Sequence, residues 1–291
     1  MLVYVENVLV YTFLMGSIYL LIALGFSLIC GVLRIFHLGY AYIFPLTAYG
    51  TWMLMTTLDW PLIPSILGMV AIQFIIAALI YKGIIKRYLN AEDVLLTALL
   101  LIALIVEQAA NYFYPIQAGV YLDTTLMSGV FQIGGVVVPK QQVVGSVIAL
   151  LMTGAFVLFF VKTKTGMAIR ALSQDIYSSK IVGINVETLY MFTMMIVLVP
   201  VIIGTLIVVP VWALEPQMGW TYMITAILVA VLGGLGNIKG TILASYIIGL
   251  AHAMSCFVIS EPRFMNLSAL IVVMVVLIVR PQGLARSESL W

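Results

Sequence analysis

Nine apolar runs separated by short polar connections make up most of this sequence, and they restrict its fold more than any other feature. A helix needs about 20 apolar residues to cross a bilayer, and most of the runs approach that length. Only 8% of the residues are charged, whereas soluble domains carry about 25%. We therefore predict an all-α polytopic transmembrane helical bundle of about eight or nine spans, some of them broken, in one domain over residues 1–291. The runs fall at about 8–33, 36–57, 62–82, 94–114, 143–161, 187–209, 220–236, 241–259 and 266–280.

Basic residues gather on one side of the predicted membrane. If the N-terminus lies outside, nine spans put the C-terminus in the cytoplasm, with eleven Lys and Arg residues inside and two outside. Cytoplasmic loops carry an excess of Lys and Arg, so the distribution favours this orientation. The loop at 115–142 then lies outside and is expected to contain a short hairpin. The inner residues are Arg34, Lys82, Lys86, Arg87, Lys162, Lys164, Arg170, Lys180, Lys239, Arg280 and Arg286, and the outer ones are Lys140 and Arg263.

A polar segment at 165–185 interrupts the apolar pattern between the fifth and sixth runs. Arg170, Asp175 and Lys180 are too costly to place in lipid, so the segment must lie in water. Its length suits a helix at the membrane surface, and the orientation above places it in the cytoplasm. We expect residues 163–185 to form a surface on which a partner protein acts.

Two glycine-rich joints lie between apolar runs. The first spans Gly31–Gly39 and is followed by Pro45, and the second spans Gly233–Gly240. Irregular backbone in a membrane is tolerated only where protein or a water-filled cavity satisfies it, so paired interruptions point to a transport path. For the first joint we favour a role in the transport path, because Pro45 should break a helix inside the membrane. For the second joint we favour a tight turn, so that residues 220–259 form either two spans or a hairpin around the turn.

Four motifs, in order along about residues 8–286, resemble the permeases of branched-chain amino acid ABC importers. The polar segment resembles the coupling segment of that family, which runs roughly T-x-x-G-x-x-x-R-A-x-x-x-D and closes on G-I-N. The residues of the segment that carry the resemblance are Thr165-Gly166, Arg170-Ala171, Asp175 and Gly183-Ile184-Asn185. The other three motifs are the stretch Gly16–Gly25, the run Ala230–Gly240, similar to A-V-L-G-G-x-G-S/N-x-x-G, and Arg280-Pro281-Gln282-Gly283-Leu284.

The resemblance implies partners and a location. It implies a core of this chain with a second permease subunit, a different but homologous one, joined by two cytoplasmic ATPase subunits and an extracytoplasmic substrate-binding protein. The order of elements looks more like the shorter permease of the pair. ATP would be bound by the partner subunits, with no cofactor in this chain, in a bacterial or archaeal inner membrane. The residues implied to couple the chain to the ATPases are Gly166, Arg170, Ser173, Asp175 and Gly183.

The candidate substrate path departs from the family pattern. Where the family carries N-F-A-H-G or N-L-S-H-G, this chain has His37-Leu38-Gly39-Tyr40-Ala41, followed by several aromatic residues. Thr225 stands near the place of a family lysine, and His252 stands where a glutamate is common. These departures leave the substrate open among branched-chain amino acids, urea, amides and aromatic acids. The residues predicted for the path are His37, Gly39, Tyr40, Tyr42, Phe44, Thr225, Gly233 and Gly234.

Three ionisable residues within or beside the spans have two interpretations each. For His37, a titratable gate and a helix-end position stay equally open. For His252, a hydrogen bond to a neighbouring helix is favoured over a role in the path. Glu107 shares a helix face with Asn111 and is expected to sit in a packed polar cluster rather than in a proton relay.

Several functional classes are excluded or weakened. The chain contains no G-x-x-x-x-G-K-[ST], so we expect no ATPase site of its own. Two His and two Cys, widely spaced, predict no metal site, and no catalytic constellation or nucleic-acid-binding feature is evident. The alternative to an importer subunit is an ATP-independent secondary carrier or channel. That class requires several intramembrane acids, and only Glu107 qualifies clearly.

Overall fold

The fold comes from a computed structural model that describes residues 2–114, 127–211 and 214–285. Each of the nine predicted runs holds a helix, so the all-helical membrane bundle is confirmed. Within the described residues, seven helical segments are long and apolar enough to cross a bilayer. Two further helices, α2 and α10, have 14 and 16 residues. They reach about 21 and 24 Å, short of the ~30 Å hydrocarbon core.

The first half of the chain comprises α1 to α5, and the second half begins with a hairpin and α6. The bounds up to α6 are α1 Leu2–Leu33, η1 Leu38–Tyr42, α2 Ile43–Thr56, α3 Leu62–Ile80, η2 Tyr81–Ile85, α4 Lys86–Tyr88, α5 Glu92–Phe113, β1 Val130–Ile133, β2 Val136–Pro139 and α6 Lys140–Lys162. The remaining elements are α7 Lys164–Gln174, α8 Ile176–Ile181, α9 Val186–Val208, α10 Met218–Gly233, α11 Ile238–Phe257, η4 Pro262–Phe264 and α12 Met265–Val279.

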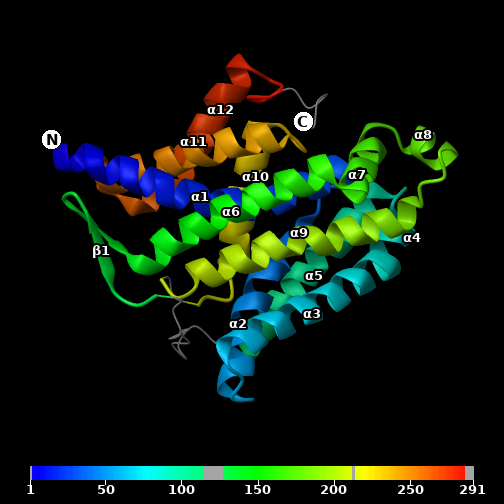
Figure 1. Cartoon of the computed structure of the whole chain (residues 1–291), viewed down its shortest axis with the longest axis horizontal. Helices are drawn as coiled ribbons and strands as arrows, with labels where there is room; N and C mark the ends of the chain where they lie inside the picture. The colour runs from blue at the N-terminus through cyan, green and yellow to red at the C-terminus, as the bar shows by residue number, and fades with distance from the viewer. Residues whose placement is uncertain (1, 115–126, 212–213, 286–291) are drawn as a thin grey trace.

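Helix α1 is the central element of the bundle. It packs against α6, α9, α10 and α11 (Figure 1), and nearly every side chain from Gly16 to Leu33 is buried. Glycines allow α1 and α11 to approach closely, because a Cβ on Gly249 would lie 2.9 Å from the Thr12 carbonyl oxygen. By contrast, only a minor share of α3, α5 and α12 is buried in the single chain, as expected of helices that face lipid or another subunit.

The predicted external loop contains the expected hairpin. Strands β1 and β2 pair antiparallel with Ile133 opposite Val136, and Gly134 adopts φ +61° in the turn between them. Val136 and Val138 bury their side chains against Leu14 of α1. Residues 115–126 of the predicted loop lie outside the described residues, as does the predicted inner residue Arg286.

The first glycine-rich joint does interrupt a span, but not at Pro45. Helix α1 ends at Leu33, an irregular stretch and the 3-10 turn η1 follow, and α2 begins at Ile43. Pro45 is therefore the third residue of a helix, where the N–H that it lacks has no intrahelical partner to lose. The prediction that Pro45 breaks a helix is wrong. The break lies upstream, where Arg34 takes a left-handed conformation with φ +56°.

Candidate functional site

The polar segment folds into two short helices rather than the single helix that its length suggested. These helices, α7 and α8, extend beyond the ends of α6 and α9 (Figure 1). The break lies at Asp175, which leaves the helical region with φ −147° and ψ 110°. Its carboxylate accepts hydrogen bonds from the backbone N–H groups of Tyr177 and Ser178, which makes it the N-cap of α8.

The capping bonds also stabilise the charge of Asp175. The Ser178 hydroxyl donates to the carboxylate, and together with the Ser178 backbone N–H it lowers the pKa of Asp175. A carboxylate held this way stays ionised at neutral pH. Asp175 thus has a structural role within the segment, and a contact between its side chain and a partner protein remains a prediction.

The two predicted glycines shape this segment. Gly166 sits against the end of α6, where a Cβ would lie 2.4 Å from the Phe159 carbonyl oxygen. Gly183 follows α8 with φ +86°, a conformation that glycine adopts at helix C-termini. Asn185 then caps α9 by accepting from the Thr188 N–H at 3.1 Å. The G-I-N motif therefore ends one helix and starts the next.

Arg170 and Ser173 point back toward the bundle rather than fully into water. The Arg170 guanidinium is half-buried and donates to the Val161 carbonyl at 3.5 Å. Ser173 is buried, and its hydroxyl donates to the Arg170 carbonyl at 2.7 Å. Of the residues predicted for coupling, these two stabilise α7 and its packing against the end of α6. Neither has a fully exposed side chain.

Arg34 links the polar segment to the central helix, a contact that sequence reasoning missed. Its guanidinium donates to the carbonyls of Ser173 at 2.9 Å and Gln174 at 3.1 Å. These carbonyls belong to the last turn of α7, which has no intrahelical donors for them and carries negative dipole charge. The sequence showed Arg34 only as an inner basic residue. Its pairing with a segment about 140 positions away could not be read from it.

Helix α8 carries a second feature that the sequence analysis overlooked. Tyr177, Ile181 and Val182 are 75%, 70% and 80% exposed, in a segment that the sequence predicts to lie in water. We call these three residues the α8 apolar surface. Exposed apolar patches mark sites that interact with proteins or with membranes. The signal in the sequence is the presence of apolar residues inside a polar segment.

The residues predicted from the first joint pack into the core. Tyr40, Tyr42 and Phe44 are fully buried, and the Tyr40 hydroxyl donates to the Ile22 carbonyl at 2.5 Å. His37 is 1% exposed, and neither ring nitrogen has a hydrogen-bond partner among the described residues. Together with Gly39, these residues pack beside α5 and contact α1 through Tyr40, and their place on a substrate path stays a prediction.

Gly233 and Gly234 lie in a tight turn between α10 and α11, the interpretation that the sequence favoured. Asn237 caps α11 by accepting from the Gly240 N–H at 3.0 Å. The C-terminal motif packs on this turn, because the Leu284 N–H donates to the Leu232 carbonyl at 2.8 Å. Two motifs separated by about 45 residues therefore form one structure, and 220–259 is two helices with a turn.

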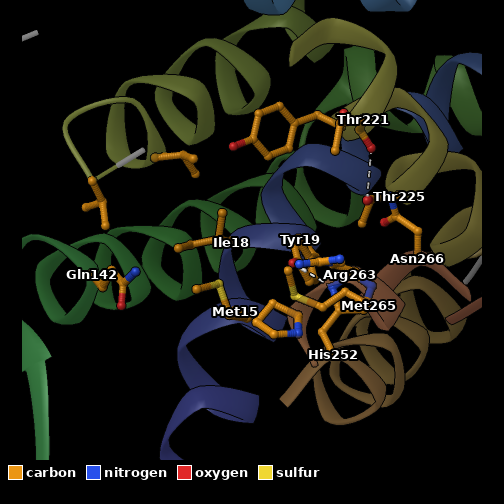
Figure 2. A pocket seen from close by; sticks show the side chains of 14 residues that line it. Met15, Ile18, Tyr19, Gln142, Thr221, Thr225, His252, Arg263, Met265 and Asn266 are labelled. Atoms are coloured by element: carbon orange, nitrogen blue, oxygen red, sulfur yellow. Dashed lines mark hydrogen bonds between the residues drawn. The ribbon is translucent and has the colours of Figure 1, made fainter. Parts of the chain in front are cut away.

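Thr225, the remaining predicted path residue, lines a cavity of about 290 Å³ near the opposite end of the bundle from α7 and α8. Figure 2 shows side chains from α1, α6, α10, α11 and the start of α12 arrayed around it. None of the other predicted path residues lines this cavity, although the Phe44 ring lies 5.4 Å from that of Tyr222 in its wall. The described lining residues are Met15, Ile18, Tyr19, Gln142, Val208, Val211, Thr221, Tyr222, Thr225, His252, Pro262, Arg263, Met265 and Asn266.

His252 and Glu107 each pair with another helix. The Tyr19 hydroxyl and His252 Nδ1 are 2.7 Å apart, which confirms the interhelical hydrogen bond expected for His252. The Trp220 indole N–H donates to the Glu107 carboxylate, so the polar partner of Glu107 comes from α10 rather than from Asn111 on its own helix. Glu107 is 8% exposed, which agrees with a packed structural role.

Comparisons with known proteins cover nearly the whole chain. Residues 8–279 match the family described as "Branched-chain amino acid transport system / permease component". The high-affinity branched-chain amino acid transport system permease protein BraD of Pseudomonas aeruginosa is 26% identical over 282 residues, which are 92% of this chain and 92% of that protein. LivH of Escherichia coli, described by the same phrase, is 25% identical over 285 residues, with 93% and 92% covered.

A solved structure has a similar fold. It is PsaBC from Streptococcus pneumoniae in complex with Fab, with a TM-score of 0.52 and 14% identity. The similarity covers 96% of this chain and 92% of that one. At this identity the likeness concerns the arrangement of helices alone.

Proposed function

The chain belongs to the family of branched-chain amino acid transport system permease components, and from this premise we propose that it is a permease subunit of an ATP-driven ABC importer. Its substrate is a branched-chain amino acid or a related small polar or aromatic solute. Relatives named for branched-chain amino acid transport cover more than nine-tenths of the chain, which supports this substrate class. ATP is bound by partner subunits and not by this chain.

The single observation that carries the proposal is the α8 apolar surface on a segment anchored at both ends. Exposed apolar side chains in water offer a partner several kcal/mol of binding free energy, since each contributes about 1.5–3 kcal/mol when fully buried. The caps at Thr163, Asp175 and Asn185 and the contact with Arg34 hold the segment rigid. A rigid anchored helix transmits a force that a flexible loop would dissipate.

The route of coupling runs from α8 through α7 and Arg34 into α1. Helix α1 then reaches the cavity, where Met15, Ile18 and Tyr19 form part of the wall. Helix α1 continues for sixteen residues from Ile18 to Leu33, the residue before Arg34, which corresponds to about 24 Å. Closure of the ATPases on α8 would thereby tilt α1 and change access to the cavity.

The proposed assembly follows the family pattern. The chain acts as one domain, with residues 115–142 outside and 163–185 in the cytoplasm, in a bacterial or archaeal inner membrane with its N-terminus outside. It pairs with a second, homologous permease subunit, and two ATPases bind from the cytoplasm. A substrate-binding protein delivers solute from outside. The positive charges near α4, α7 and α8 support the proposed orientation, because they gather at one end of the bundle.

Co-purification tests the proposed function against the alternative of an ATP-independent carrier. We expect the tagged chain, expressed from its native operon, to retain ATPase subunits through size-exclusion chromatography. Proteoliposomes holding this complex should import solute only with the binding protein outside and ATP inside. Import by the purified chain with no ATPase bound would instead establish a secondary carrier.

Replacing Arg34 should uncouple ATP turnover from uptake. Arg34→Asn removes both bonds to the last turn of α7, while asparagine tolerates the left-handed conformation at this position. We expect the complex to assemble and to hydrolyse ATP, with uptake reduced about tenfold, equivalent to ~1.4 kcal/mol of lost coupling free energy. The ratio of solute imported to ATP hydrolysed in proteoliposomes measures this effect. Arg87→Asn, an exposed change on α4, should leave that ratio unchanged, and an unchanged ratio in Arg34→Asn would remove Arg34 from the coupling route.

A further inference from the structure

An exposed apolar stripe runs along α3 toward a group of cations. Leu67, Ile75 and Leu79 are 65%, 61% and 65% exposed in the single chain, and Ala71 is exposed between them. These four residues follow one another at intervals of four, so they share one face of the helix. We call them the α3 apolar stripe. It presents a continuous hydrocarbon surface that no described part of the chain covers.

The length of α3 places the cations beyond it at a membrane boundary. Leu62–Ile80 has 19 residues, which span about 29 Å, close to the ~30 Å thickness of the hydrocarbon core. Trp60, an exposed residue just before the helix, marks one boundary, where indole rings are enriched. Lys82 and Arg87 then lie at the opposite boundary, at the end of the bundle that carries α7 and α8 (Figure 1).

Two of the cations at this boundary have no counter-charge. Lys86 forms an ion pair with Glu187 of α9 at 2.6 Å, so its charge is compensated. Lys82 and Arg87 are exposed and form no ion pair with any acidic residue that the structure describes. The Arg87 guanidinium carbon lies 5.7 Å from the centroid of the Tyr88 ring, a cation–π contact that uses none of its N–H donors.

Gly83 leaves an open notch between the α3 apolar stripe and these two cations. It lies directly after Lys82 and four positions before Arg87, and a Cβ at this position would meet no atom within 4 Å. Glycine is less favourable than alanine in a helix by about 1 kcal/mol, so helix formation does not account for it. Gly83 also lies in η2, a π-helical turn, and such turns are frequent at functional sites.

We propose that the α3 apolar stripe, Lys82, Gly83 and Arg87 form a binding site for one anionic phospholipid of the leaflet that α4 borders. The headgroup phosphate lies over Gly83, where Lys82 and Arg87 donate hydrogen bonds to its oxygens, and an acyl chain lies along the stripe. Basic residues beside the end of a membrane helix attract anionic lipids. An apolar surface followed directly by unpaired cations complements this amphiphile, whereas a protein packed on the same face would have to supply carboxylates opposite both cations.

Photolabelling of the purified complex in lipid nanodiscs tests the site. The probes are phosphatidylglycerol and phosphatidylcholine with the same diazirine-bearing acyl chain, and the measurement is the amount of each lipid attached to the peptide that covers residues 67–79. We expect at least fivefold more label from phosphatidylglycerol in the wild type, and a ratio near one in the double variant Lys82→Gln and Arg87→Gln. The double variant Lys162→Gln and Lys164→Gln removes the same charge at the same end of the bundle and should keep the wild-type ratio.

Gly83→Leu separates the shape of the site from its charge. It fills the notch and keeps both cations, so labelling by phosphatidylglycerol should fall to the level of phosphatidylcholine. Gly154→Leu fills an equally open position on α6 and should change neither lipid. Both variants should fold, because the new Cβ meets no neighbouring atom in either and leucine favours a helix over glycine.

Three results would overturn the assignment. Equal labelling by the two lipids in the wild type would remove the preference for an anionic headgroup. Loss of that preference on addition of inorganic phosphate would make this a site for free anions. Absence of label from both lipids would place a protein subunit on the stripe.

The lipid site stands apart from the proposed function. It lies on α3, η2 and α4, away from the route through α8, α7 and Arg34, so its loss should leave the ratio of solute imported to ATP hydrolysed unchanged. Photolabelling reports on the lipid alone, and the two proposals therefore fail independently.

Discussion

Making the α8 apolar surface polar should abolish capture of the ATPase subunits. The triple variant Tyr177→Gln, Ile181→Gln and Val182→Thr removes three side chains that are 70–80% exposed in the single chain. Burial of each would contribute about 1.5–3 kcal/mol to binding, so their joint loss should weaken the complex by two orders of magnitude or more. We expect the tagged variant to reach the membrane in normal amounts but to lose the ATPases during purification, and uptake to fall below detection.

Lys180→Gln is the matched control for this experiment. It changes an exposed residue on the same short helix and leaves the apolar side chains in place. It should retain the ATPases. If the triple variant also retained them and imported solute at the wild-type rate, α8 would have no part in coupling, and contacts of Arg170 or Asp175 would have to replace it.

Gly240→Ala should prevent the bundle from forming. A Cβ at this position would lie 1.8 Å from the Gly233 carbonyl oxygen, and Gly240 is buried where α10 meets α11. Overpacking of a well-packed site costs about 1–3 kcal/mol when side chains can move aside. Here the obstructing atom is backbone, so the two helices must separate, and the C-terminal motif that packs on the turn would be displaced with them. We expect the membrane-inserted protein to fall to a small fraction of the wild-type amount in quantitative immunoblots of membranes.

The same substitution at Gly154 separates this clash from a general effect of alanine. Gly154 lies on an exposed face of α6, and a Cβ there would meet no atom within 4 Å. Alanine in a helix interior is favoured over glycine by about 1 kcal/mol, so Gly154→Ala should accumulate at least as well as the wild type. Normal accumulation of Gly240→Ala would show that the α10–α11 turn is looser than described.

Local structure was largely predictable, because it depends on neighbouring residues. Each of the nine apolar runs located a helix among the described residues, and the loop composition gave the hairpin at Val130–Pro139. The second glycine joint was correctly expected to be a turn. The position of Pro45 was misread, since a proline in the first turn marks where a helix begins. For Asp175, the predicted partner contact stays a prediction, and its role as the N-cap of α8 was not predicted.

The sequence by itself determined which segments are helical and to which family the chain is similar, and it predicts which segment lies in water. Only the tertiary structure decided that Arg34 donates hydrogen bonds to the last turn of α7 and that Trp220 donates one to Glu107. It also decided that His252 lines the same cavity as Thr225, whereas His37 does not. Hydrophobic periodicity and composition fix the partition of each segment between lipid and water, and this depends on the residues of that segment alone. Pairings between helices depend on close packing and hydrogen bonds between residues more than 100 positions apart, and no local pattern in one chain records them.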